Sequence, residues 1–330
     1  SHFGRPKEGS YDESLSLKII VDSLEQLVGE KVTFSEDWIN GIEFNGNNIV
    51  LCENVRFQIG EKENSPTLSK KISTLGDVYI FDAFGVSHRK TASTYGVSKY
   101  LNMFAGDLLK NEIMNAKKIL LTQKRPMTTI ISGAKISTKL ALIKKLISKS
   151  DNIILGGGIL NTFLKAMGHE VGDSLIEDSF IGQAVEILNS DDSCKIIMPI
   201  DVMVSSNSNL DNPKTREISM VQSNDKILDI GNKTIDCYNK IITESSTIFW
   251  NGPLGYVEKS PFDNGTIKIS KAIASSQAYS VVGGGDTIPI IESLKLQNKF
   301  SCLSTGGGSL LKFIEGEKLP VLELLGMYEL

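Results

Sequence analysis

The sequence predicts an α/β fold with two doubly wound parallel-sheet domains. Short apolar runs alternate with segments of helical period along most of the 330 residues, which is the pattern of strand–helix units with a parallel sheet. Three of these runs lead directly into a triglycine turn, at residues 156–158, 283–285 and 306–308. The length also suffices for two domains of ordinary size. We expect one domain over residues 1–120 and a second over residues 121–330, whose C-terminal tail returns toward the first.

The first domain should contain an amphipathic helix and part of a parallel sheet. Apolar residues recur at helical spacing from Leu17 to Leu27, and Gly29 is a typical helix end. Strands are expected at residues 32–34, 49–52 and 78–81, with a short helix around residues 67–75. A longer amphipathic helix over residues 106–120, together with the turn around Arg125, is the expected hinge between the domains.

The second domain should continue the alternation with a longer series of strands. Between most of them the sequence has helical period, including a short helix at residues 288–294, and the polar loop at residues 205–213 has no clear assignment. The strands are expected at residues 127–132, 152–155, 195–198, 227–229, 247–250, 279–282 and 300–304. Ligands of an open parallel sheet bind beyond the carboxyl ends of its strands, so residues that follow these strands are the candidates for a site.

Composition limits the classes of function. The net charge of -4 and the pI near 5.6 give no overall attraction to nucleic acid. Signal-peptide and membrane-spanning patterns are missing, so we expect a cytoplasmic protein, monomeric, with small-molecule substrates and neither nucleic-acid nor membrane partners. Four widely spaced cysteines, Cys52, Cys194, Cys237 and Cys302, lack metal-ligand spacing and are expected to be free thiols.

Glycine turns between a strand and a helix suit a phosphate ligand. They point backbone N–H groups and a helix N-terminus at one place, and Asp286 beside one of them could accept a metal ion bound to that phosphate. Lys135 and Lys139 follow the strand at residues 127–132 and are four residues apart. We therefore expect both on one face at the start of the next helix, directed at the same anion, although solvated surface lysines would show the same spacing.

Two other groups of residues suggest further parts of a site. Asn251 and Pro253 begin a rigid loop after a strand, with Glu258 close behind, and this loop could line a nucleoside pocket or be only a tight turn. In the first domain, Arg5, Arg56 and Arg89 lie in loops near strands. Guanidinium groups bind phosphate and carboxylate with a planar fork, so these arginines could converge on a small, multiply charged acid.

With these motifs in their order and spacing, the chain resembles bacterial phosphoglycerate kinases over almost its whole length. The matching segments are residues 1–6, 53–57, 82–89, 133–139, 156–158, 250–255, 283–287 and 304–308. The resemblance implies two doubly wound domains, the first binding 3-phosphoglycerate and the second Mg-ATP or Mg-ADP, with Mg²⁺ as cofactor. It also implies reversible phosphoryl transfer between ATP and the carboxylate of 3-phosphoglycerate, a reaction of glycolysis and gluconeogenesis.

Residue roles follow from the resemblance, motif by motif. The substrate site would comprise His2, Phe3, Gly4, Arg5, Arg56 and Arg89. Lys135 and Arg89 would act on the moving phosphoryl group, with Gly306 and Gly307 stabilising it. The nucleotide site would comprise Lys139, Gly156, Gly157, Gly158, Asn251, Pro253, Glu258, Gly284, Gly285, Asp286 and Thr287, with Asp286 directed toward Mg²⁺.

The chain departs from the family pattern in three places and at its beginning. Ser132, Phe81 and Lys312 stand where the family often has Gly, Asn and an acid. The family's first strand and substrate-binding loop precede the position of Ser1, so the first domain is expected to be incomplete. The chain as given is then expected to bind Mg-ADP with little phosphoryl transfer, and a truncated, impaired nucleotide-binding fragment is the alternative function.

Two other classes fit less well. A nicotinamide-dependent dehydrogenase would share the α/β pattern, but the three glycine turns do not complete G-x-G-x-x-G, and no G-x-x-x-x-G-K-[ST] motif occurs. A non-catalytic nucleotide-binding protein would not need the lysine, aspartate and arginine side chains described above. Phosphoglycerate kinase is therefore the preferred reading.

Overall fold

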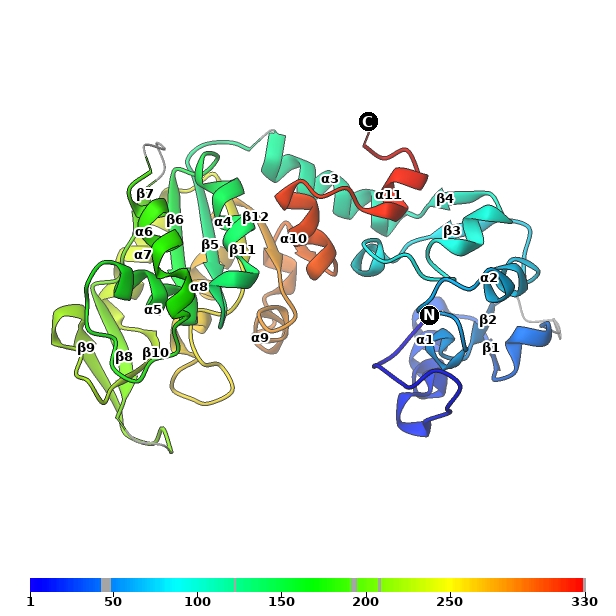
Figure 1. Cartoon of the computed structure of the whole chain (residues 1–330), viewed down its shortest axis with the longest axis horizontal. Helices are drawn as coiled ribbons and strands as arrows, with labels where there is room; N and C mark the ends of the chain where they lie inside the picture. The colour runs from blue at the N-terminus through cyan, green and yellow to red at the C-terminus, as the bar shows by residue number, and fades with distance from the viewer. Residues whose placement is uncertain (43–48, 122, 191–194, 207–208, 329–330) are drawn as a thin grey trace. The chain divides into compact units, whose positions relative to one another are not determined.

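The chain folds into two compact units. The structure, a computed structural model, describes residues 1–42, 49–121, 123–190, 195–206 and 209–328 (Figure 1). Unit 1 comprises Ser1–Lys110 and Lys318–Leu330, and unit 2 comprises Asn111–Glu317. Both units contain parallel β-structure combined with helices, which confirms the predicted α/β class.

Unit 1 has two short parallel strand pairs. Strand β1 (Val32–Ser35) pairs with β2 (Ile49–Cys52), and β3 (Tyr79–Phe81) pairs with β4 (Met103–Ala105). The prediction of a single sheet through the first three of these strands was therefore wrong for the described residues. Strand β4, which ends just before the predicted helix at residues 106–120, was not predicted.

The helices of unit 1 begin and end at residues suited to those positions. Helix α1 (Val21–Val28) ends at Gly29, whose φ of 73° is the left-handed conformation expected of a C-terminal glycine. Helix α2 (Pro66–Ser73) begins after Ser65, whose side chain accepts from a backbone N–H of the first turn. Helix α11 (Pro320–Leu324) joins this unit from the far end of the chain, where the Val321 N–H donates to the Ser87 carbonyl.

A six-stranded parallel sheet forms the centre of unit 2. Its strand order is β13-β12-β11-β5-β6-β7, and six of the seven predicted strands are confirmed in it. Its strands are β5 (Met127–Ser132), β6 (Asn152–Gly156), β7 (Lys195–Ile197), β11 (Thr247–Asn251), β12 (Tyr279–Gly283) and β13 (Cys302–Ser304). Every residue of β5 and β11 is buried, as expected of strands covered on both faces.

The seventh predicted strand belongs to a different sheet. Strand β10 (Lys226–Ile230) pairs antiparallel with β8 (Asp201–Ser205), which pairs antiparallel with β9 (Pro213–Glu217). The prediction placed β10 in the parallel series and missed β8 and β9. Four of the five residues of β9 are exposed and its sequence is polar, so it lacks the apolar alternation of a typical strand.

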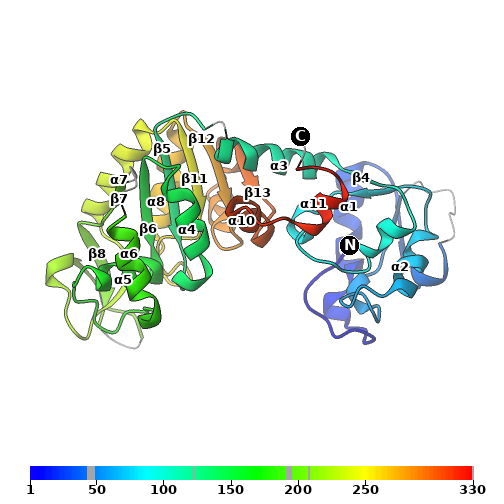
Figure 2. The same ribbon diagram turned by 45° about the horizontal axis from the view of Figure 1, so that its top comes forward.

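Helices cover both faces of the parallel sheet (Figures 1 and 2). Helix α4 packs beside α10, and α7 packs beside α8. The helices of unit 2 are α4 (Leu140–Ile147), α5 (Gly157–Ala166), α6 (Ile181–Leu188), α7 (Asn232–Glu244), α8 (Asn264–Ser275), α9 (Ile288–Ser293) and α10 (Gly308–Glu315). Helix α3 (Asp107–Leu121), the predicted hinge helix, contributes residues to both units.

The strand order places the first strand of unit 2 in the middle of the sheet. From β5 the chain proceeds through β6 and β7 toward one edge and later through β11, β12 and β13 toward the other. The point between β5 and β11, where the direction reverses, is where open parallel sheets bind their ligands. The loops after these two strands begin at Gly133 and Gly252.

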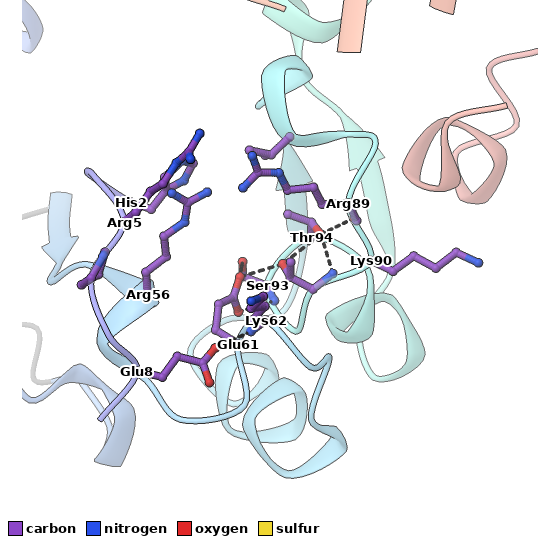
Figure 3. Close-up of a pocket in the computed structure, with 13 residues that line it drawn as sticks. His2, Arg5, Glu8, Arg56, Glu61, Lys62, Arg89, Lys90, Ser93 and Thr94 are labelled. Carbon is purple, nitrogen blue, oxygen red and sulfur yellow. Dashed lines mark hydrogen bonds between the residues drawn. The ribbon is translucent and has the colours of Figure 1, made fainter. Parts of the chain in front are cut away.

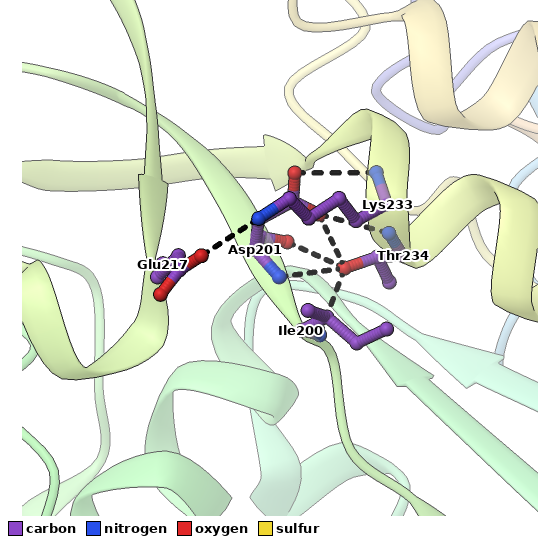
Figure 4. Close-up of polar contacts among 5 residues, drawn as sticks. All are labelled: Ile200, Asp201, Glu217, Lys233 and Thr234. Carbon is purple, nitrogen blue, oxygen red and sulfur yellow. Dashed lines mark hydrogen bonds and ion pairs between the residues drawn. The ribbon is translucent and has the colours of Figure 1, made fainter.

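The antiparallel sheet is tied to the helices by a buried carboxylate (Figure 4). Asp201 of β8 accepts from the Thr234 N–H at 2.8 Å, from the Thr234 hydroxyl at 2.8 Å and from the Lys233 N–H at 3.2 Å. These donors belong to the first turn of α7, which follows Gly231 and therefore has no side-chain cap of its own. Asp201 supplies the missing acceptor from a neighbouring strand.

Of the helices in the described ranges, none is long and apolar enough to cross a membrane. Cys52, Cys237 and Cys302 are free thiols, and Cys194 lies outside the described residues.

Candidate active site

Unit 1 contains a cavity of about 720 Å³ rich in basic side chains, which we call the basic pocket (Figure 3). His2, Arg5 and Arg56 approach it from one side and Arg89 from the other. Its charged lining residues are His2, Arg5, Glu8, Arg56, Glu61, Lys62, Arg89 and Lys90. The three arginines that the sequence singled out therefore meet at one cavity.

A buried asparagine brings the N-terminal segment and Arg56 together. Asn54 donates to the carbonyl oxygens of Phe3 at 2.7 Å and Leu15 at 2.9 Å, and it accepts from the Arg56 N–H at 3.1 Å. The Arg56 guanidinium in turn donates to the Gly4 carbonyl at 2.5 Å. Phe3 and Gly4 thus contribute backbone acceptors that hold the basic side chains, and they do not themselves line the cavity.

Mutual repulsion and partial burial affect the basic side chains of this pocket. Burial, followed by the nearby Arg56 guanidinium, lowers the pKa of His2 to about 4. Burial and the nearby Arg89 guanidinium also lower the pKa of Arg56. Cations held near one another would be stabilised by an anion bound between them.

A second cavity, of about 420 Å³, lies at the reversal point of the parallel sheet in unit 2. We call it the glycine pocket. It is formed by the loops after β5, β11 and β12 and by the turn before α10. Its lining residues are Ser132, Gly133, Ala134, Lys135, Thr138, Lys139, Asn251, Gly252, Pro253, Gly284, Gly285, Asp286, Gly307, Gly308 and Leu311.

Glycine is required where two of these loops cross. Gly252 has a φ of 93°, and a Cβ atom at this position would lie 2.1 Å from the Ser132 carbonyl oxygen. The Ser132 hydroxyl donates to the Pro253 carbonyl, so the loops after β5 and β11 are joined directly. Ser132, one of the three positions expected to depart from the family pattern, therefore joins two loops of the pocket wall.

The two lysines line the glycine pocket but not as predicted. Lys135 precedes a 3₁₀ turn (Ile136–Thr138), and Lys139 directly precedes α4, so neither lies on an α-helical face. A 3₁₀ turn has a shorter period than an α-helix, and the four-residue spacing therefore does not carry its usual meaning. The folding of this turn over the end of β5 nevertheless brings both lysines to the cavity.

The ammonium group of Lys139 is hydrogen-bonded to a neutral side chain. This ammonium group donates to the side-chain oxygen of Asn251, whose amide nitrogen donates to the Gly283 carbonyl at 2.6 Å. Burial lowers the pKa of Lys139 to about 8, and Glu315 and Asp286 oppose part of that shift. An incoming phosphate would favour the charged form of this lysine.

The turn after β12 combines a carboxylate with an unsatisfied hydroxyl. Asp286 lines the glycine pocket and is exposed. Thr287 beside it is fully buried, and within the described part of the chain its hydroxyl has no hydrogen-bond partner. A buried hydroxyl without a partner is costly. Because Thr287 does not line the glycine pocket, this hydroxyl is not counted among the groups that could bind a ligand there.

Several predicted nucleotide residues lie outside the lining. Gly157 and Gly158 pack against the Gly133–Ala134 backbone, where a Cβ atom on Gly158 would lie 2.2 Å from the Ala134 carbonyl oxygen. Glu258 is exposed in the loop after β11. The predicted residues that do not line the glycine pocket are Gly156, Gly157, Gly158, Glu258, Thr287 and Gly306. Their roles in nucleotide binding stay predictions.

The sequence reasoning missed two acidic residues of the basic pocket. Glu8 accepts from the Gly60 and Lys62 N–H groups at 3.1 and 2.7 Å. Glu61 is 5% exposed and binds a loop about 30 residues further along the chain. Only the tertiary structure places these acids beside arginines, since the sequence alone shows two acids in loops.

Together, the two pockets place candidate anion-binding groups of different kinds in two separate units. The match to known proteins agrees with this arrangement. Residues 1–317 match the phosphoglycerate kinase family. A phosphoglycerate kinase of Francisella tularensis subsp. holarctica is 44% identical over 330 residues, which cover 98% of this chain and 84% of that protein. That of Baumannia cicadellinicola is 46% identical over 327 residues, covering 98% and 83%.

Solved structures give the same result. Phosphoglycerate kinase from Coxiella burnetii has a TM-score of 0.87 and 38% sequence identity, covering 99% of this chain and 85% of that one. The enzyme from Pyrococcus horikoshii has a TM-score of 0.84 and 28% identity, with the same two coverages. The sequence, the fold and the two anion pockets lead to one conclusion: this chain belongs to the phosphoglycerate kinase family.

Proposed function

We propose that this chain catalyses reversible phosphoryl transfer between ATP and 3-phosphoglycerate, giving ADP and 1,3-bisphosphoglycerate, with the basic pocket binding the phosphoglycerate and the glycine pocket the nucleotide phosphates. The reaction is that of the family, and it is a step of glycolysis. The observation that carries the assignment is the glycine pocket, where two lysines and one aspartate face glycine-rich turns at the reversal point of the sheet.

The basic pocket suits the phosphoglycerate because its charge comes from side chains. Arg5, Arg56 and Arg89 can each offer a planar pair of N–H donors to a phosphate or carboxylate. His2 adds a fourth donor. A small ligand with two anionic ends needs several such groups at fixed positions, and the opposite placement of Arg56 and Arg89 provides them (Figure 3).

The glycine pocket suits a polyphosphate because many of the groups it can offer are backbone N–H groups, which carry a partial positive charge. Gly307 and Gly308 lie at the start of α10, where free N–H groups face an incoming anion. The single carboxylate of Asp286 fits a Mg²⁺ ion held mainly by phosphate oxygens and water, which is the usual coordination of that ion. Mg²⁺ bound there with the nucleotide would neutralise phosphate charge as the phosphoryl group moves.

The chemistry requires no general base. The substrate carboxylate is ionised at neutral pH and can attack the γ-phosphorus directly, while the bond to the ADP oxygen breaks. The protein then contributes positioning and charge stabilisation. Lys135, exposed at the edge of the glycine pocket, is the residue we assign to the moving phosphoryl group.

The test is a coupled assay of ATP formation combined with calorimetry on two variants. Arg89→Ala should weaken phosphoglycerate binding by roughly 10- to 100-fold, the scale of a lost charge-assisted pair, and leave ADP affinity nearly unchanged. Asp286→Ala should weaken Mg-ADP binding and leave phosphoglycerate affinity nearly unchanged.

The opposite pattern would contradict the assignment of the pockets. A wild-type chain that binds ADP but forms no ATP from 1,3-bisphosphoglycerate would instead support the alternative function, a truncated and catalytically impaired nucleotide-binding fragment of such a kinase.

A further inference from the structure

We propose that Glu61 is a positioning residue for Arg89: it fixes the turn at residues 91–94 and thereby aims the Arg89 guanidinium into the basic pocket. This inference rests on the proposed role of that pocket in phosphoglycerate binding. Glu61 is buried, although it lies among cations that are expected to bind an anion.

Glu61 makes its side-chain hydrogen bonds to one short turn. One carboxylate oxygen accepts from the Thr91 hydroxyl at 2.7 Å and from the Ser93 hydroxyl at 2.6 Å. The other accepts from the Ser93 N–H at 3.0 Å, and the Glu61 backbone carbonyl accepts from the Ala92 N–H at 2.9 Å. Three consecutive residues of the turn are thus held by a single residue from a distant loop. Figure 3 shows the contact between Glu61 and Ser93.

The turn at residues 91–94 is also hydrogen-bonded to Arg89. The Thr94 hydroxyl donates to the Arg89 carbonyl at 2.8 Å and lies 3.0 Å from the Thr91 hydroxyl oxygen. It also accepts from the Thr91 N–H at 3.1 Å. The backbone of Arg89 is therefore connected to Glu61 through Thr94 and Thr91, by hydrogen bonds alone.

The charge of Glu61 offsets part of the lowering of the Arg56 pKa, but it opposes the binding of an anion to the pocket. Through space, a carboxylate beside Arg56 and Arg89 weakens the attraction of the pocket for an anion. Among the described residues, the side-chain partners of Glu61 are neutral hydroxyl and N–H groups, and none of the ion pairs includes it. A carboxylate accepts all three bonds at once, which an amide cannot do.

The charge of Glu61 and its positioning role therefore predict changes of opposite sign in phosphoglycerate affinity when Glu61 is replaced by Gln. Glu61→Gln keeps the size of the side chain, removes its charge and replaces one acceptor by a donor. If charge alone mattered, this change would tighten phosphoglycerate binding. If Glu61 positions Arg89, we expect the KM for phosphoglycerate to rise roughly 10- to 100-fold, the scale of a misplaced binding group, while the KM for ATP stays within about twofold.

Two further variants separate the explanations. Glu61→Asp keeps the charge but withdraws the carboxylate by one methylene group, so positioning predicts a loss and charge predicts none. Thr91→Val changes no charge and removes the hydroxyl that donates to Glu61, so it should raise the same KM by a smaller factor.

A double-mutant cycle with Arg89→Ala completes the test. If Glu61 acts through Arg89, then Glu61→Gln should have little further effect on the KM for phosphoglycerate once Arg89 is removed. Fully additive effects would overturn the proposal, as would a Glu61→Gln enzyme that binds phosphoglycerate as tightly as wild type or more tightly.

Two controls keep the outcome clear. If Glu61→Gln loses ADP affinity or its normal unfolding midpoint, Thr91→Val decides, and an unchanged KM in that variant overturns the proposal. A wild-type chain whose activity does not saturate with phosphoglycerate would instead remove the proposed function itself, which is a different result from a failure of Glu61.

Discussion

The two pockets of this chain offer different kinds of groups to an anion. The basic pocket of unit 1 relies on the side chains of His2, Arg5, Arg56 and Arg89, which come from loops. The glycine pocket of unit 2 relies largely on backbone at the ends of buried strands, with only Lys135 and Lys139 as cationic side chains. The candidate binding groups of the basic pocket are therefore side chains, whereas those of the glycine pocket are largely the backbone of the fold itself.

This difference has consequences for mutation and for pH. An exposed side chain on a loop can be replaced with little effect on stability, so changes at Arg5 and Arg89 of the basic pocket should affect ligand binding more than stability. A backbone turn at the end of a strand cannot be altered without disturbing the sheet that holds it. The glycine pocket should accordingly tolerate changes only at the few positions that face open space.

The largest effect is expected on turnover, when Lys135 of the glycine pocket is replaced. Lys135→Ala should lower turnover by roughly 10²- to 10³-fold, the usual scale for one lost transition-state donor, and should change ADP affinity much less. Lys144→Ala, at an exposed position on the following helix, is the matched control and should leave turnover unchanged. Steady-state kinetics of both variants decides, and turnover within about a factor of two of wild type for Lys135→Ala would refute the role.

A comparison of two glycines of the glycine pocket tests whether the crossing of its loops constrains the backbone. Gly252→Ala places a methyl group 2.1 Å from the Ser132 carbonyl oxygen at a φ of 93°. It should lower the free energy of unfolding of unit 2 by about 2–3 kcal/mol. A Cβ atom on Gly285 meets nothing within 4 Å, so Gly285→Ala should be nearly neutral for stability. Equal losses in the two denaturation curves would show that the loop crossing at Gly252 is not a constraint.

Proton uptake on nucleotide binding should distinguish the glycine pocket. Burial holds the pKa of Lys139 at about 8 in the free protein, and a bound polyphosphate should raise it. Binding then takes up as much as one proton above about pH 8, and ADP affinity falls as the pH rises through this window. Calorimetry in two buffers of different ionisation enthalpy measures the uptake. Lys139→Arg, which is always charged, should abolish it.

The basic pocket should show a smaller uptake at acid pH. His2 has a pKa of about 4, chiefly because of burial, and a bound phosphoglycerate should raise it. The protein then takes up part of a proton between about pH 4 and the higher pKa of the bound state, and affinity weakens as the pH rises through that range. Because the ligand phosphate itself titrates near pH 6, the measurement is the difference between wild type and His2→Asn. No difference would mean that His2 does not contact the anion.

The same contrast explains how much of the fold could be predicted. In unit 2 the largely buried strands β5, β6, β11 and β12 show as apolar runs, and their positions were predicted correctly. The exposed, polar strand β9 carries no such signal. Strand pairing is also not encoded in the period of one strand, so the antiparallel partners of β10 could not be foreseen.

The site was predicted to a different degree in each unit. Glycine turns after strands are local signals, and the turns at Gly284 and Gly307 do line the pocket. Lys135 and Lys139 reach the same pocket, but through a 3₁₀ turn that the spacing did not reveal. Glu61 could not be found from the sequence, because its role depends on a turn about 30 residues away that only folding brings close.

The orientation of Asn251 determines what Lys139 meets before any nucleotide arrives. Because the Asn251 amide nitrogen is committed to the Gly283 carbonyl, its oxygen must face the lysine. The ammonium group therefore rests on a neutral acceptor that an anion can displace without breaking an ion pair. We expect this arrangement to favour ligands that bind several groups of the pocket at once over simple monovalent anions. The uncharged amide of Asn251 would then contribute to the selectivity of the pocket among anions.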